Sequence, residues 1–191
     1  MREERPLDTP EITTERLLLR RFRRDDAEDI FRYCSDPEVA RMTSWSPHES
    51  LDDTHRFLDW AEMMYDEKLG TPWAMVPRDG DCIIGAIQLS VVWPHLRGEV
   101  GYWLGRPLWG QGLATEATRA VLAYAFDDLE LHRVEARCEP ENVGSERVMQ
   151  KVGMQLDGVL RGHVYSKGRF RDMKLYAILR DEWRADAAGD R

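Results

Sequence analysis

The sequence predicts a mixed α/β (α+β) fold in which helices flank a single, mostly antiparallel sheet. Residues 72–104 read as three apolar strands separated by an Asp79–Gly80 turn and a Pro94–Gly98 loop, which favours an antiparallel meander. After residue 104 the order changes to helix, strand, helix and a closing pair of strands. This order is typical of one layer of sheet covered by helices.

The chain is expected to form one domain. Its 191 residues are enough to bury a sizeable core, and no repeat, linker or low-complexity segment divides them. We place the domain at residues 12–184 and expect flexible tails at residues 1–11 and 185–191.

Before the meander, the pattern predicts one strand and two helices. The strand covers residues 15–23, and the first helix covers residues 24–36. Asp25 and Glu28 have the spacing of a capping box at the start of this helix.

The second helix has its own start signal in the run "SPHE". Ser46 is the expected N-cap, Pro47 takes the first helical position, and the helix should end near Gly70. After the meander we expect a helix, a strand, a helix closed by a glycine, and a hairpin, at residues 114–131, 132–140, 142–153, 154–165 and 170–180.

Composition narrows the classes of partner and the compartment. A net charge of −8 argues against bulk nucleic-acid binding and suits a cationic small molecule or a basic peptide. Three isolated cysteines favour a reducing cytoplasm over a disulfide framework. We expect no membrane span, because no apolar run is long enough, and no metal, because the five histidines lack ligand spacing.

The stretch "LWGQGLATEA" places two glycines between an aromatic strand and an alanine-rich helix. The first turn of a helix has unpaired N–H groups, and glycines let an anion approach them closely. Gly110, Gln111, Gly112, Leu113 and Ala114 are therefore expected to hold a phosphate or pyrophosphate. A tight turn without a ligand is the alternative.

Two other phosphate motifs fit the stretch poorly. A P-loop requires a lysine followed by Ser or Thr after the last glycine, whereas Leu113 and Ala114 follow here. A dinucleotide fingerprint requires a third glycine, whereas position 115 is Thr.

Three longer segments carry a family resemblance. "GEVGYWLGRPLWGQGLATEA", "NVGSERVMQKVGM" and "LYAILRDEW" occur in this order, after an opening "ERLLLRRFRRDDAEDI". Over residues 12–183 the chain resembles the GNAT superfamily of acetyl-CoA-dependent N-acetyltransferases, and within it the RimJ/RimL-like branch of ribosomal-protein N-terminal acetyltransferases. The resemblance implies the GNAT fold, with a sheet whose strands splay apart.

The resemblance also implies a site for acetyl-CoA. The glycine turn would hold the pyrophosphate, the preceding strand would pair with the pantetheine arm, and Asn142 would bond the pantetheine amides. Trp109 stands where the superfamily often has Arg or Gln, which backbone binding tolerates. The implied contacts are Tyr102, Trp103, Leu104, Trp109, Gly110, Gln111, Gly112, Leu113, Ala114, Thr115 and Asn142.

Two residues are candidates for the chemistry. Glu99 alternates onto the face of Gly101 and Trp103, where apolar neighbours favour a carboxylate that takes a proton from the amine. The alternative is a glutamate at the rim that only positions a cationic substrate. Asn142 is also the expected N-cap of the helix over residues 142–153. Ser145 lies in the first turn of this helix, where the family places Ser or Tyr near the sulfur. It is either the acid for the leaving thiolate or a serine of the capping turn.

The sequence therefore predicts an acetyl-CoA-dependent N-acetyltransferase that acts on a primary amine. The acceptor is a protein N-terminus by resemblance, or a small amine such as an antibiotic, polyamine or amino acid. A non-catalytic acyl-CoA-binding sensor is the alternative from another class. Homodimers are frequent in this branch. His48, His95, Trp45 and Trp93 lie in loops, where they either line the acceptor pocket or serve as ordinary surface and packing residues.

Overall fold

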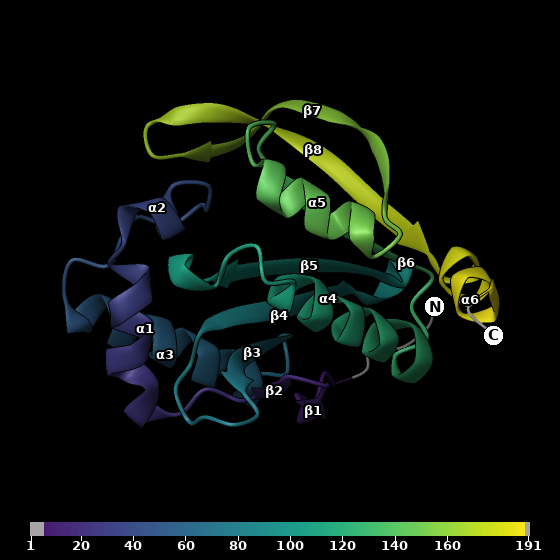
Figure 1. The fold of residues 1–191 in the computed structure, drawn as a ribbon. Helices are drawn as coiled ribbons and strands as arrows, with labels where there is room; N and C mark the ends of the chain where they lie inside the picture. The colour runs from purple at the N-terminus through teal and green to yellow at the C-terminus, as the bar shows by residue number, and fades with distance from the viewer. Residues whose placement is uncertain (1–5, 190–191) are drawn as a thin grey trace.

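A computed structural model describes residues 6–189 of the chain, with side chains up to residue 184. Its centre is an eight-stranded sheet in the order β1-β2-β3-β4-β5-β6-β8-β7 (Figure 1). Only the β5–β6 pair is parallel. The strands are β1 (Ile12–Thr13), β2 (Leu17–Arg20), β3 (Gly70–Pro77), β4 (Gly85–Val92), β5 (Arg97–Leu104), β6 (Arg133–Cys138), β7 (Gln155–Ser166) and β8 (Arg169–Leu179).

Helices cover both faces of this sheet. The α-helices are α1 (Ala27–Cys34), α2 (Pro37–Ala40), α3 (Leu51–Asp66), α4 (Leu113–Ala123), α5 (Val143–Lys151) and α6 (Arg180–Gly189). Short 3₁₀ turns are η1 (Arg24–Asp26), η2 (Trp93–His95) and η3 (Arg106–Leu108), and a π-helical turn, η4 (Tyr124–Asp128), continues α4. The predicted mixed, mostly antiparallel fold is confirmed.

Strand β3 shows how one sheet supports two cores. Trp73 and Met75 point to the face that packs with α4 and α5, whereas Ala74 and Val76 belong to the core shared with α1 and α3. A strand covered on both faces is mostly apolar, and every residue of the run "GTPWAMV" is buried. The meander predicted over residues 72–104 is therefore the shared wall of both cores.

Strands β5 and β6 pair over only three positions, from Arg97 opposite Arg133 to Glu99 opposite Glu135. Strand β5 then continues to Leu104 beside β4, without β6 as a partner on its other side. Beyond Glu99, side chains from both faces of the sheet can therefore border the space between β5 and β6.

The two helix starts predicted in the first half are wrong in detail. Asp25 and Glu28 form no capping box. The turn η1 precedes α1 instead, and the Asp26 carboxylate accepts from the backbone N–H of Arg23 at 2.6 Å and from Arg20 at 2.7 and 2.8 Å. Helix α3 begins four residues later than "SPHE" predicts, with Ser50 as N-cap. Asp53 accepts from the backbone N–H of Ser50 at 3.1 Å and so closes this start.

Other boundaries differ less. The strand predicted over residues 15–23 is shorter in the structure, where β2 covers Leu17–Arg20. Helix α3 ends at Asp66, and β3 begins at Gly70. A seven-residue connection, residues 78–84, joins β3 to β4 and contains the Asp79–Gly80 turn.

The predicted tails lie partly outside the described residues. Inside them, Leu7 is buried in the larger core, and the carbonyl of Pro10 accepts from the Trp73 indole at 2.7 Å. Helix α6 extends to Gly189. The outer limits of the domain remain a prediction.

The closing hairpin reaches back over the first half of the chain. Strand β7 forms one edge of the sheet, and its pairing with β8 shifts register between Leu156 and Gly158 and between Leu160 and Val164. At the hairpin turn, Lys167 Nζ donates to the carbonyl of Ala40 at 2.6 Å, which places the tip beside α2 (Figure 1).

The buried pair Arg20–Asp26 offers a test of this packing. Both side chains are almost fully buried, at 5% and 6% exposure, so Asp26→Asn leaves an uncompensated buried guanidinium. We expect the free energy of unfolding to fall by about 3–5 kcal/mol, measured by urea denaturation. The exposed Asp25→Asn is the matched control and should change it by less than about 0.5 kcal/mol. Equal losses of stability in Asp26→Asn and Asp25→Asn would contradict the role of Asp26 as the buried partner of Arg20.

Candidate active site

A cleft of about 610 Å³ opens where β5 and β6 separate. Its walls come from both faces of the sheet, because alternate residues of β5 point to opposite sides. Among the sequence-predicted site residues, five line it: Glu99, Tyr102, Trp103, Asn142 and Ser145. Leu104 and the predicted residues 109–115 follow along the chain, beyond the lining of the cleft.

The glycine turn lies at the end of β5 and opens helix α4. Gly110 and Gly112 have φ angles of +77° and +79°, a region that side chains strongly disfavour. A Cβ at Gly110 would meet no atom within 4 Å, so the turn faces open space. Gly112 is the N-cap of α4, and the first-turn N–H groups that follow it are available to a ligand.

Side chains from two parts of the chain hold this turn. The Trp109 indole donates to the carbonyl of Leu104 at 2.7 Å, and the Gln111 side chain donates to the carbonyl of Pro107 at 3.1 Å. Arg16 donates to the Gln111 carbonyl at 2.9 Å and to Glu116 at 2.6 Å. Sequence reasoning missed Arg16, because its partners lie 95 and 100 residues away and no local pattern links them.

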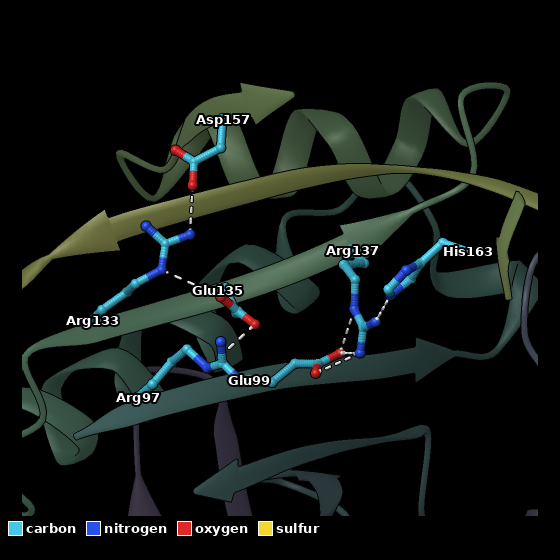
Figure 2. Close-up of polar contacts among 7 residues, drawn as sticks. All are labelled: Arg97, Glu99, Arg133, Glu135, Arg137, Asp157 and His163. Atoms are coloured by element: carbon cyan, nitrogen blue, oxygen red, sulfur yellow. Dashed lines mark hydrogen bonds and ion pairs between the residues drawn. The ribbon is translucent and has the colours of Figure 1, made fainter. Parts of the chain in front are cut away.

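Glu99 lies at the last residue pair of β5 and β6 and is bound by an arginine from the other strand (Figure 2). Arg137 Nη2 donates to both carboxylate oxygens of Glu99 at 2.6 Å, and its Nε donates at 2.9 Å. A third residue, His163 of β7, contacts the far side of the same guanidinium. The apolar surroundings expected for Glu99 are therefore wrong, and Arg137 is a site residue that the sequence did not indicate.

A second set of ion pairs marks the paired part of the two strands (Figure 2). Glu135 accepts from Arg133 at 3.2 Å and lies 3.6 Å from Arg97, while Arg133 also binds Asp157 of β7. These contacts hold β5, β6 and β7 together just before the strands diverge.

Ser145, Tyr102 and Asn142 meet on the other wall of the cleft. The Tyr102 phenol lies 2.9 Å from Ser145 Oγ, and Asn142 Oδ1 accepts from the Ser145 N–H at 3.1 Å. The predicted N-cap role of Asn142 is confirmed. Burial raises the pKa of Tyr102 well above its ordinary value, so the phenol keeps its proton and can donate it in a hydrogen bond. Sequence reasoning assigned Tyr102 only a backbone role and missed this hydroxyl.

Aromatic rings line the remaining wall. Trp45 contacts Trp103 and His48, with ring centroids 6.4 and 5.7 Å apart. The His48 imidazole bonds Thr54 at 2.8 Å, and burial lowers the pKa of His48, which favours the neutral ring. Trp93, in contrast, is buried in the larger core, and His95 is exposed outside the cleft.

Within the described residues, no group of three or more His, Cys, Asp or Glu side chains is arranged to hold a metal ion. Nor does any helix in that part of the chain have the length and apolar character needed to cross a membrane.

A splayed sheet, a glycine turn at a helix start and a polar wall beside the opening define an acyltransferase of the N-acetyltransferase class. Comparison with known proteins agrees, since residues 16–155 match the family model described as "Acetyltransferase (GNAT) domain". The chain belongs to this GNAT acetyltransferase family.

Individual relatives point to one branch of the family. The chain is 32% identical to an uncharacterized N-acetyltransferase, p20, of Bacillus licheniformis, over 90% of this chain and 97% of the relative. It is 26% identical to the ribosomal-protein-serine acetyltransferase of Escherichia coli, over 70% and 74% of the two chains. The RimJ structure of Mycobacterium smegmatis, described as a complex with CoA-disulfide, has a TM-score of 0.78 at 23% identity and covers 91% and 89%. The resemblance to the RimJ/RimL-like branch is confirmed.

The Tyr102–Ser145 contact gives a test by a double-mutant cycle. If the two hydroxyls act as one unit, Tyr102→Phe and Ser145→Ala should each lower kcat about tenfold, and the double variant should be no worse than either single one. Release of free thiol during acetyl transfer measures kcat. Additive losses would show that the two hydroxyls act independently.

Proposed function

We propose that the chain transfers the acetyl group of acetyl-CoA to a primary amine. The observation that carries this proposal is the glycine turn, which opens α4 and is separated from the strand that lines the cleft only by the short turn η3. Its positive φ angles and the empty space beside Gly110 suit a diphosphate that approaches the backbone. Arg16, which is paired with Glu116, holds the turn in shape through the Gln111 carbonyl.

The chain's own groups would then hold the cofactor along β5. Backbone N–H groups from Gly110 to Thr115 bind the diphosphate, since the Trp109 N–H already donates to the Arg106 carbonyl. The open edge of β5 at Tyr102, Trp103 and Leu104 bonds the pantetheine arm through backbone groups other than the Leu104 carbonyl, which accepts from the Trp109 indole. Asn142 adds a polar contact. Acetyl-CoA supplies an activated acetyl thioester, and the N–H of Leu104 or its neighbour polarises its carbonyl.

The amine must lose a proton before it forms the new C–N bond, because an ammonium group has no lone pair. In our proposal Glu99 accepts this proton, directly or through water. Arg137 holds the carboxylate in place with three hydrogen bonds and so fixes its direction. As the C–S bond breaks, Ser145, supported by the Tyr102 phenol, donates a hydrogen bond to the leaving thiolate.

For the acceptor we favour a protein N-terminus, because the relative from Escherichia coli is a ribosomal-protein-serine acetyltransferase. Small amines remain the alternative class of acceptor. A non-catalytic sensor would keep the glycine turn without using Glu99 and Ser145. We also propose a cytoplasmic location, supported by three free cysteines, and leave a homodimer as a prediction.

The cofactor part of this proposal depends on Gly112. Gly112→Val places a branched side chain at φ +79° and blocks the turn, while the nearest atom to its Cβ is a guanidinium nitrogen of Arg16 at 3.5 Å, an ordinary contact distance. We expect acetyl-CoA affinity, measured by calorimetry, to fall at least about 100-fold in a folded protein. Gly168→Val is the matched control, since Gly168 has φ +77° in the distant hairpin turn. Equal affinity in both variants would contradict the phosphate site.

The proton-transfer part depends on Glu99. Glu99→Gln removes the proton acceptor, so turnover should fall most at low pH, where deprotonation of the amine is hardest. The profile of kcat/KM against pH measures this effect. Asp157→Asn, which removes an ion-pair partner outside the cleft, should leave the profile unchanged. An unchanged profile in Glu99→Gln would assign Glu99 to substrate positioning.

A further inference from the structure

Among the described residues that line the cleft, every ionised side chain has a partner of opposite charge. Four ionised side chains line it, and they form two pairs: Glu99 with Arg137, and Glu139 with Arg171. The second pair is almost fully buried, with 6% exposure for Glu139 and 9% for Arg171. Each carboxylate already has a guanidinium partner, so the formal charge of these four side chains is zero.

The pairing of these four charges bears on the cationic partner that the acidic composition suggested. The net charge of −8 suggested a cationic partner, but the surplus of carboxylates does not line the cleft. A polyamine or a basic peptide gains affinity from unpaired carboxylates near its several ammonium groups. Here each extra ammonium would have to displace an arginine or remain without a partner.

Aromatic side chains form much of the cleft lining on the face of the sheet that carries Glu99. Trp45, Trp103, Phe22, Phe57 and Trp60 all line it, and all are half-buried. Trp45 meets Trp103 at 6.4 Å, while the Phe57 ring lies 5.1 Å from Phe22 and 5.6 Å from Trp60. We call these five residues the aromatic wall.

The position of the aromatic wall links it to the chemistry. Trp103 shares its face of β5 with Glu99, because both lie at odd positions of the strand. An acceptor whose amine reaches Glu99 therefore places the rest of the molecule beside Trp103 and Trp45. When an apolar group covers half-exposed rings, binding becomes more favourable by about 25 cal/mol per Å² of apolar surface removed from water.

We propose that the aromatic wall selects acceptors with one primary amine attached to an aromatic or bulky apolar group, and that the cleft discriminates against polycationic amines. The inference rests on the proposed function and narrows its acceptor class. The selected chemistry occurs in aralkylamines and in peptides whose first residue is aromatic, so the test includes both sources.

Equilibrium binding tests this inference without any need for turnover. Calorimetry compares phenethylamine with ethylamine, which lacks only the ring, and with spermidine, each with and without coenzyme A. We expect the ring to strengthen binding about 10–100-fold and spermidine to bind less tightly than phenethylamine. The peptides Phe-Ala-Ala-Ala and Ser-Ala-Ala-Ala, with free N-termini, form the second arm, where the first should bind more tightly. Tighter binding of spermidine, or the absence of any ring effect in both arms, would overturn the inference.

Variants locate the effect in the aromatic wall. Trp45→Ala should reduce the ratio of phenethylamine to ethylamine affinity at least about fivefold, and Trp60→Ala provides a second test if the first variant unfolds. Phe170→Ala removes an aromatic ring that is 71% exposed and lies outside the cleft, and it should keep the wild-type ratio. A wild-type ratio in both wall variants would overturn the inference. Thiol release from acetyl-CoA with the same amines tests the proposed function separately, because selective binding without release contradicts only that function.

Discussion

The rest of the structure depends on the short pairing between strands β5 and β6. Strands β5 and β6 share only three residue pairs, and beyond Glu99 one side of β5 has no strand beside it. Backbone N–H and C=O groups need partners wherever they leave water. An extended ligand arm with amide groups can supply them in the way that a neighbouring strand would. The same opening brings Glu99, from one face of the sheet, and Tyr102, from the other, to a single cleft.

Much of the fold was predictable because it is encoded locally. The meander, the helix closed by Gly153, the N-cap at Asn142 and the last hairpin follow from periodicity and turn residues. The two wrong helix starts show the limit of this logic. Several acidic and hydroxyl residues compete for each cap, and Asp26 is held both by the backbone N–H of Arg23 and by Arg20 of β2.

The candidate site was predictable where backbone conformation carries it, and it was missed where side chains from distant segments meet. The glycines at positions 110 and 112 indicate positive φ angles from the sequence alone. In contrast, Arg137 reaches Glu99 across 38 positions, and Tyr102 reaches Ser145 across 43. Such contacts depend on the register of β5 against β6 and on where α5 packs, which no short pattern specifies.

The register shifts of β7 have a consequence for self-association. β7 pairs with β8 on one side only, and the open side of a twelve-residue edge strand offers a template on which another sheet can grow. In β7 two irregularities and Gly162, with φ +57°, interrupt the ladder. Bulges of this kind increase the local twist and protect such edges from aggregation. Continuous strand-to-strand pairing between two copies of this chain is therefore disfavoured at β7.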